Sequence, residues 1–120
     1  VDDAVKFVQR EIRRGSTYDG ILLDPPKFGR GPSGQVWEFF DQLPELLSGC
    51  RQILSQDPLF VVLTAYAIRA SALCTYYALE EMAAGLSGSL ETGELALTES
   101  SAGHVLPTAI FARWCSRTAL

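Results

Sequence analysis

The amino-acid sequence predicts an α/β fold, in which two parallel strands and an antiparallel C-terminal hairpin form a sheet with flanking helices. The segments 21–23 and 59–63 are continuously apolar, which is typical of strands covered on both faces in a parallel sheet. Segments with apolar residues at helical spacing precede, separate and follow these strands. The period changes to that of strands at 89–98 and 105–115, and their short connection favours an antiparallel pair. This order of elements indicates half of a three-layer α/β sheet.

The first element is a helix over about residues 3–14. Asp2 or Asp3 is suited to cap its N-terminus. Gly15 is suited to end it, after arginines in the last turn, where the helix dipole favours cations. The apolar residues share one face of this helix and the polar residues share the other: Val1, Val5, Val8 and Ile12 against Lys6, Gln9, Arg10, Arg13 and Arg14.

Two further helices are predicted between and after the apolar strands. A glycine-rich segment at 29–34 predicts a loop, and a helical pattern of apolar residues follows at 36–54. Pro44 is expected to kink or divide that pattern and to open a second helix, because proline lacks an N–H group and is favoured at helix starts. The last helix ends at Gly85. Its apolar face is formed by Ala72, Tyr76, Leu79 and Ala83.

Length and composition restrict the class of protein. A chain of 120 residues with 48% hydrophobic residues is one globular domain or part of one. The net charge of −4 argues against strong nucleic-acid binding by this chain alone, because such binding depends on neutralising phosphates. It leaves open that a single base enters a pocket. No apolar run approaches the ~20 residues of a membrane span, and the chain starts at Val1, so we expect it to begin inside a longer protein.

The three cysteines are predicted to be reduced thiols. Cys50, Cys74 and Cys115 lie far apart in the sequence and form no CxxC pair. Their odd number also argues against a disulfide framework, so we expect a cytoplasmic protein. With a single histidine, His104, in a small polar loop, the sequence offers no spacing that suits a metal site.

The sequence Asp24-Pro25-Pro26-Lys27-Phe28 directly follows the first predicted strand and is the strongest functional signal. In open α/β sheets, ligands bind at the carboxyl ends of the strands. Two prolines fix φ at about −65° and remove two backbone donors, so we expect a stiff turn whose carbonyl groups are free to accept hydrogen bonds. An amino group on a planar ring is one donor that suits this arrangement.

Three stretches carry a resemblance to a known family: 1–8, 18–31, and Leu106-Pro107 with Phe111–Trp114. The chain resembles the C-terminal half of class I S-adenosylmethionine (SAM)-dependent methyltransferases, in particular the bacterial 23S rRNA (cytosine-5) methyltransferase-like family. The resemblance implies that residues 1–120 are a partial class I methyltransferase domain, contributing the last four strands of a Rossmann-like seven-stranded sheet. It implies SAM as cofactor and ribosomal RNA as substrate. The glycine-rich cofactor loop would lie upstream, so the isolated chain is expected to be inactive.

The resemblance also assigns roles to residues. Asp3 and Ala4 match the positions that read the adenine of the cofactor, although Asp3 is equally explained as a helix cap. Asp24, which also contacts the cofactor site, matches the catalytic loop together with Pro25, Pro26 and Phe28. In related enzymes the acid and a proline carbonyl accept from the target amino group, and the aromatic ring stacks on the flipped base, worth about 1–3 kcal/mol. A strand-ending turn with a packed phenylalanine is the alternative.

Further substrate contacts are expected from Lys27, Phe28, Arg30 and Trp37. Lys27 and Arg30, with the neighbouring glycines, would form a mobile lid that touches substrate phosphate, or a solvated loop without that role. Trp37 would cover the site, or anchor a helix against the sheet.

One departure from the family concerns the acceptor. Cytosine-5 methyltransferases use a cysteine thiolate that adds to the ring. In the resembling enzymes this cysteine follows the next strand, where the present chain has Thr64-Ala65-Tyr66. An amino-group acceptor therefore fits better, since direct transfer to nitrogen needs positioning and no covalent intermediate.

Two other functions are compatible with this fold class. A nucleotide-dependent oxidoreductase would share the sheet, but its glycine fingerprint is missing from these residues. A non-catalytic truncated half-domain would act as a binding module through an open sheet edge.

Overall fold

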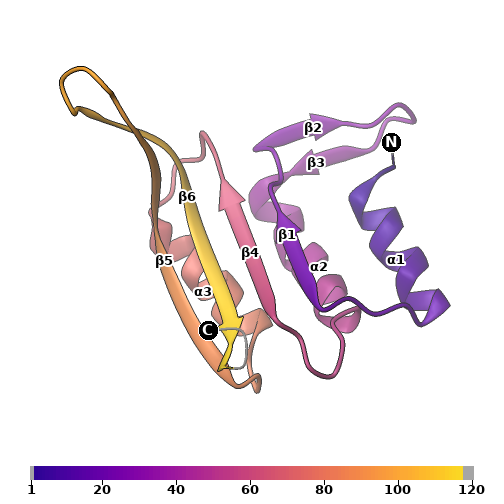
Figure 1. Cartoon of the computed structure of the whole chain (residues 1–120). Coiled ribbons are helices and arrows are strands. Elements are labelled where there is room, and N and C mark those ends of the chain that lie inside the picture. The colour runs from indigo at the N-terminus through magenta and orange to yellow at the C-terminus, as the bar shows by residue number, and fades with distance from the viewer. Residues whose placement is uncertain (1, 118–120) are drawn as a thin grey trace.

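The computed structural model describes residues 2–117 and confirms the predicted α/β fold class. Figure 1 shows the helices around a sheet, with a separate short hairpin above one end of the sheet. The elements are α1 (Ala4–Arg14), β1 (Gly20–Leu23), β2 (Phe28–Arg30), β3 (Val36–Glu38), α2 (Phe39–Gln52), β4 (Phe60–Ala65), α3 (Ala72–Met82), β5 (Gly88–Thr98) and β6 (Val105–Ser116).

The main sheet is mixed, with the strand order β1-β4-β6-β5. β1 and β4 are parallel, and β6 runs antiparallel to both β4 and β5. The parallel pair and the antiparallel C-terminal hairpin are thus confirmed, and the last strand lies between β4 and β5 (Figure 1). The register pairs Leu23 with Leu63, so β1 and β4 end at the same edge of the sheet.

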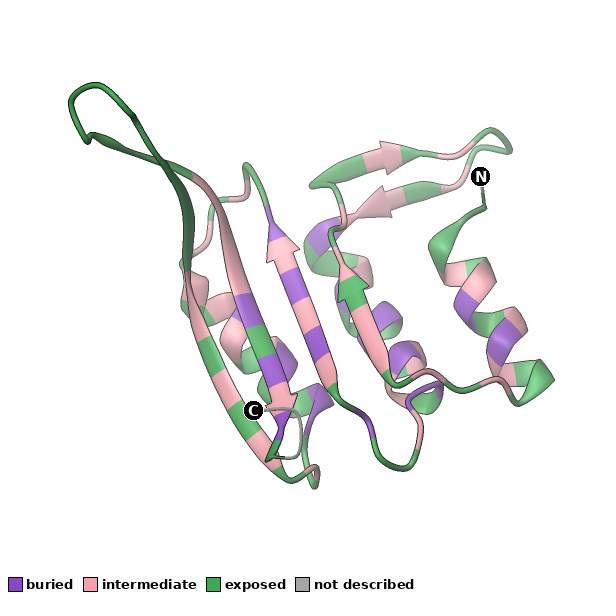
Figure 2. Cartoon of the chain, viewed as in Figure 1, coloured by how far each residue is buried: buried purple, intermediate pink, exposed green. Residues whose placement is uncertain are grey.

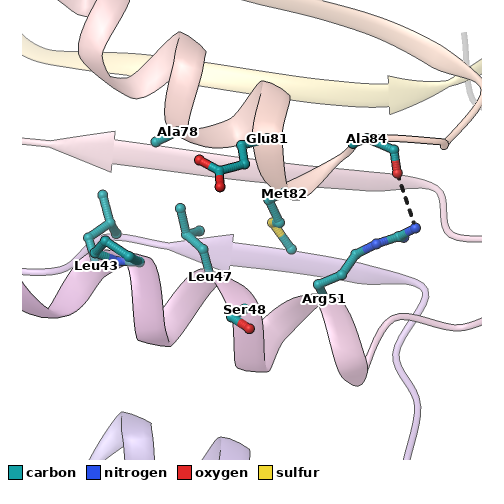
Figure 3. Close-up of a pocket in the computed structure, with 9 residues that line it drawn as sticks. Leu43, Leu47, Ser48, Arg51, Ala78, Glu81, Met82 and Ala84 are labelled. Atoms are coloured by element: carbon teal, nitrogen blue, oxygen red, sulfur yellow. Dashed lines mark hydrogen bonds between the residues drawn. The ribbon is translucent and has the colours of Figure 1, made fainter.

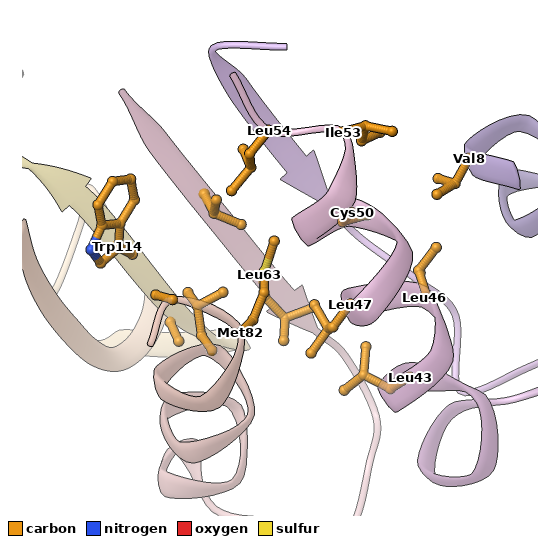
Figure 4. Packing of buried hydrophobic residues seen from close by; sticks show 14 of the residues in the cluster. Val8, Leu43, Leu46, Leu47, Cys50, Ile53, Leu54, Leu63, Met82 and Trp114 are labelled. Atoms are coloured by element: carbon orange, nitrogen blue, oxygen red, sulfur yellow. The ribbon is translucent and has the colours of Figure 1, made fainter. Parts of the chain in front are cut away.

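The hydrophobic core lies between one face of the sheet and the helices α2 and α3. Along β4, buried residues alternate with half-buried ones (Figure 2). Val61 and Leu63 are fully buried in this face, and the side chains of Leu47 from α2 and Met82 from α3 gather near Leu63 (Figure 4). Trp114 of β6 closes one end of the same cluster.

The expectation that both apolar strands are covered on two faces is wrong for the described residues. Leu22 of β1 is 73% exposed, and its register partner Val62 is only half-buried. α2 and α3 lie on the opposite face, and α1 packs against α2 instead of the sheet. Residues 2–117 therefore form two layers, not three, because no helix among them reaches the face that carries Leu22.

The first helix agrees with its prediction. The Asp3 side chain accepts from the Lys6 N–H at 2.9 Å and is the N-cap, which decides between the two candidate aspartates. Gly15 ends the helix with φ of 69°, a left-handed conformation that favours glycine. Val1, which was expected on the apolar face, lies outside the described residues.

The loop and helix expected between 29 and 54 differ from the structure. Phe28–Arg30 and Val36–Glu38 pair as an antiparallel hairpin, and the helix begins only at Phe39. The Gln42 side chain explains this start, since its Nε2 donates to the Val36 carbonyl at 2.7 Å and its Oε1 accepts from the Glu38 N–H. These bonds hold the preceding residues in strand conformation although their apolar spacing continues the helical pattern.

Pro44 does not divide the second helix, contrary to expectation. α2 continues through it to Gln52 as one element. Proline removes one backbone hydrogen bond. Burial of the apolar face of the helix outweighs this loss. That face consists of Phe39, Leu43, Leu46, Leu47 and Cys50.

The C-terminal half follows its predicted order. α3 ends at Met82, and Gly85 adopts a left-handed φ of 80° in the turn that follows. The β5–β6 hairpin extends beyond the rest of the sheet, and its far end is exposed (Figures 1 and 2). His104 lies in that exposed connection, with Nδ1 3.1 Å from Oε2 of Glu99. None of the helices in the described part of the chain is long and apolar enough to span a membrane.

Candidate functional site

The predicted motif lies at the carboxyl end of β1, where the strand gives way to the turn at Asp24. Leu23 pairs with Leu63 in parallel register. The residues that follow these two, Asp24 and Thr64, are therefore also neighbours. The Thr64 hydroxyl donates to Oδ1 of Asp24 at 2.5 Å and lies 3.3 Å from the Leu23 carbonyl oxygen. A short hydrogen bond to a carboxylate is among the stronger kinds, so the Asp24 side chain is held in one position.

The two proline carbonyl groups of the motif differ. The Pro26 carbonyl accepts from the Trp37 indole N–H at 2.6 Å, so the expectation that it is free is wrong. The following carbonyl, of Lys27, accepts from the Phe39 N–H at 3.0 Å. Within residues 2–117 no group donates to the Pro25 carbonyl. The motif therefore keeps one proline carbonyl available for a ligand.

A groove of about 650 Å³ brings most of the predicted site residues together. The residues that line it come from α1, the end of β1 with the turn that follows, the β2–β3 hairpin and α2. Figure 1 shows where these elements lie. The groove is large enough for part of a cofactor-sized ligand. The predicted residues in its lining are Asp3, Ala4, Asp24, Pro25, Pro26, Arg30 and Trp37.

Two predicted substrate residues, Lys27 and Phe28, do not line the groove. Phe28 is 52% exposed on the hairpin, and the Arg30 guanidinium carbon lies 5.9 Å from the centre of its ring. This is a cation–π contact at an exposed site. Stacking of Phe28 on an acceptor stays a prediction, and so does the contact of Lys27 with phosphate.

The N-cap explanation of Asp3 is confirmed, and it leaves the second carboxylate oxygen without a partner in the described part of the chain. The Ala4 N–H has no partner within its own helix either, because it belongs to the first turn. An acceptor and a donor on neighbouring residues thus both belong to the lining of the groove.

Thr64 is the residue that sequence reasoning missed. It was noted only as the place where a cysteine is lacking. The parallel register of β1 and β4 is the signal that identifies it as the neighbour of Asp24, and register is a property of the folded sheet. Gln42, which fixes the end of the hairpin and lines the groove, was also missed.

The cysteines lie apart from the motif. All three are free thiols, and Cys50 is buried in the core, where desolvation raises the pKa of its thiol to about 11. Cys74 and Cys115 are partly buried. Among residues 2–117, His, Cys, Asp and Glu side chains form no group of three that could hold a metal ion.

A second hollow, of about 300 Å³, lies between α2 and α3 (Figure 3). Its walls are mostly apolar, with Leu47 of α2 opposite Met82 of α3 and Leu43 nearer Ala78. Arg51 closes one end by donating to the Ala84 carbonyl at 3.4 Å. None of the predicted site residues lines this hollow.

Comparisons with known proteins show which structures share this fold. No protein-family model matches the chain, and no curated protein matches it. Among solved structures, a SAM-dependent methyltransferase from Agrobacterium tumefaciens superposes with a TM-score of 0.91 and 51% sequence identity, over 96% of this chain and 38% of that protein.

Two more distant structures show the same fold. SMU.776, a methyltransferase-like protein complexed with SAH, has a TM-score of 0.68 at 19% identity, over 95% of this chain and 30% of its own. A further methyltransferase-like structure, from Streptococcus mutans, has a TM-score of 0.62 at 17% identity and the same coverages of 95% and 30%. The chain thus spans well under half of the length of each of these three structures, and it has the fold of part of a SAM-dependent methyltransferase.

Proposed function

We propose that this chain forms the acceptor-binding half of a SAM-dependent methyltransferase that acts on a nucleic-acid base, with ribosomal RNA as substrate. The observation that carries the proposal is the arrangement of polar groups at the end of β1. There a fixed carboxylate, Asp24, and an unclaimed carbonyl, that of Pro25, line one groove with Asp3 and Ala4. The 51% identity with the Agrobacterium methyltransferase supports the reaction class.

The groove has groups that suit the adenine of the cofactor. The free oxygen of the Asp3 carboxylate would accept from the adenine amino group, and the Ala4 N–H would donate to a ring nitrogen. SAM would supply an electrophilic methyl group on its sulfonium. The chain's own part is to hold the adenine end and to leave the edge at Asp24 open to the acceptor.

The acceptor that suits the motif is an exocyclic amino group. Its N–H groups would donate to the Asp24 carboxylate and the Pro25 carbonyl, which directs the nitrogen lone pair at the methyl group. The nitrogen–carbon bond would form as the sulfur–carbon bond breaks, with the electron pair of the broken bond left on sulfur, and the nitrogen would then release a proton to water. Such a transfer depends on alignment of the reacting atoms.

The cysteines support the choice of nitrogen over ring carbon. Methylation at C5 of cytosine uses a cysteine thiolate beside the base. The Cys50 thiol is buried in the core, with its pKa raised to about 11, so it is neither accessible nor ionised at neutral pH. The position next to Asp24 is occupied by Thr64, whose hydroxyl already donates to the carboxylate.

Contacts with RNA outside the acceptor base would be few. The chain has a net charge of −4, so it offers little neutralisation of phosphates. We infer that Lys27 and Arg30, both exposed next to the motif, contact only the phosphates that flank the acceptor.

A second candidate function follows from the edge of the sheet. β1 pairs with β4 alone, so its other edge is open among residues 2–117. Open edges pair with other strands. The chain would then be a non-catalytic module that binds a partner strand, and the groove would have no role.

A chimera tests the two functions against each other. This chain replaces the matching 38% of the Agrobacterium protein, which supplies the remainder of the domain. We expect the chimera to bind SAM in calorimetry and to methylate ribosomal RNA, with the product identified by nucleoside mass spectrometry. Asp24→Ala should abolish methyl transfer and leave SAM binding largely unchanged. Full activity of this variant would contradict the role of Asp24, and SAM binding without any methylated nucleoside would contradict the RNA substrate.

A further inference from the structure

The carboxylate of Asp24 has one partner in the described part of the chain, and this partner comes from another strand. Only the Thr64 hydroxyl bonds to it, at Oδ1, and no cation among residues 2–117 forms an ion pair with it. Building on the function proposed above, we propose that Thr64 is a positioning residue, which selects the carboxylate oxygen of Asp24 that faces the acceptor.

The pairing of β4 with its neighbouring strands restricts the position of Thr64. Thr64 lies on β4 and pairs with Phe111 of β6, and the residue before it, Leu63, pairs with Leu23 of β1. Asp24 lies in the turn just beyond the end of β1, and it is exposed. Thr64, which is held within the sheet, therefore fixes the orientation of the exposed Asp24 side chain.

The hydrogen bond has a defined consequence for the two oxygens. Because the Thr64 hydroxyl donates to Oδ1, that oxygen is held beside β4, and Oδ2 is the carboxylate oxygen without a partner among residues 2–117. Without the hydroxyl, an exposed aspartate populates several rotamers. Binding of the acceptor would then have to order the side chain, at a cost in conformational entropy. A misplacement of about 1 Å at a reacting centre costs on the order of 10²-fold in rate.

The first test measures the side chain itself, by NMR of the 120-residue chain. Thr64→Val removes the hydroxyl at nearly constant shape, Thr64→Ser keeps it, and Thr98→Val is the matched control on the exposed end of β5. The Hα–Hβ couplings of Asp24 should report one rotamer in the wild type, in Thr64→Ser and in the control. They should be averaged in Thr64→Val. Couplings that are unchanged in Thr64→Val, or averaged already in the wild type, would overturn the inference.

The second test uses the chimera described above. Thr64→Val should lower kcat by about 10- to 100-fold with unchanged KM for SAM, and Thr64→Ser should restore most of the rate. A change confined to KM, or a serine variant as slow as the valine variant, would overturn the positioning role. A wild-type chimera that methylates nothing would refute the proposed function, and the NMR couplings would still decide whether Thr64 orients Asp24.

Discussion

The hydrogen bond between Trp37 and Pro26 gives a direct test of how the motif is held. Trp37→Phe removes the indole N–H that donates to the Pro26 carbonyl at 2.6 Å and keeps an aromatic ring. The β2–β3 hairpin has only three paired positions, so it depends on such tethers. We expect this substitution to loosen the hairpin without unfolding the sheet.

The magnitude follows from the strength of one hydrogen bond. Its net contribution is about 1 kcal/mol, because water replaces the indole at a carbonyl of an exposed residue. At 25 °C this corresponds to a roughly fivefold increase in the population of the opened hairpin. The global free energy of unfolding should change little, since Trp37 only packs against the edge of the core and is not among its buried residues, and phenylalanine keeps an aromatic ring in that place.

Amide hydrogen exchange of the 120-residue chain measures this opening. The reporters are the N–H groups of Gly31, bonded to the Gln35 carbonyl at 2.8 Å, and of Phe39, bonded to the Lys27 carbonyl. Both should exchange about fivefold faster in Trp37→Phe, while Leu63 of β4 should not change. Trp114→Phe is the matched control, because Trp114 is buried in the core and its loss should speed all amides together. Unchanged reporters in Trp37→Phe would refute the tether.

Three further predictions concern the cofactor, the pH dependence and the layers. The isolated chain should bind SAM weakly or not at all in calorimetry, and micromolar affinity would contradict an incomplete cofactor site. The Tyr18 hydroxyl donates to Glu11 at 2.7 Å and holds the pKa of that carboxyl below its ordinary value of 4.5. The stabilisation by Glu11 is thus complete above 4.5 and is lost as the pH falls through the lowered pKa. In urea unfolding, the free energy of unfolding should fall at acid pH in the wild type and fall less in Glu11→Gln. Equal pH dependence of the two proteins would contradict the role of Glu11. In the same assay, Leu63→Ala in the covered face should cost about 2–5 kcal/mol, and Leu22→Ala in the open face under about 0.5 kcal/mol. Equal costs would show that the Leu22 face is covered.

The parts of the fold that sequence predicts are those with local causes. α1 was placed by its apolar spacing, its aspartate cap and Gly15, all of which act within a few residues. The strands β1 and β4 were placed by continuous apolar runs. That Asp3 and the motif line the same groove could also be predicted from the sequence. The prediction requires only that Asp3 lies at the carboxyl edge of the sheet, where ligands bind.

The parts that sequence did not predict depend on contacts between segments. The β2–β3 hairpin has strands of three residues, and its apolar spacing is also helical. It is decided by two tertiary bonds, from Gln42 to the Val36 carbonyl and from Trp37 to the Pro26 carbonyl. The position of β6 between β4 and β5 is likewise a matter of topology, which no local pattern encodes.

The hydrogen bonds around the motif also bear on the nature of the acceptor. An exocyclic amino group has two hydrogens, so a site that orients it needs two acceptors. The Asp24 carboxylate and the two proline carbonyl groups together present four oxygens. Thr64 bonds to one of them and Trp37 to another. The two oxygens that no described residue claims are Oδ2 of Asp24 and the Pro25 carbonyl. For the function proposed above, this pair suits the two hydrogens of an exocyclic amino group as the methyl acceptor, and a product methylated at any other atom would contradict this reasoning.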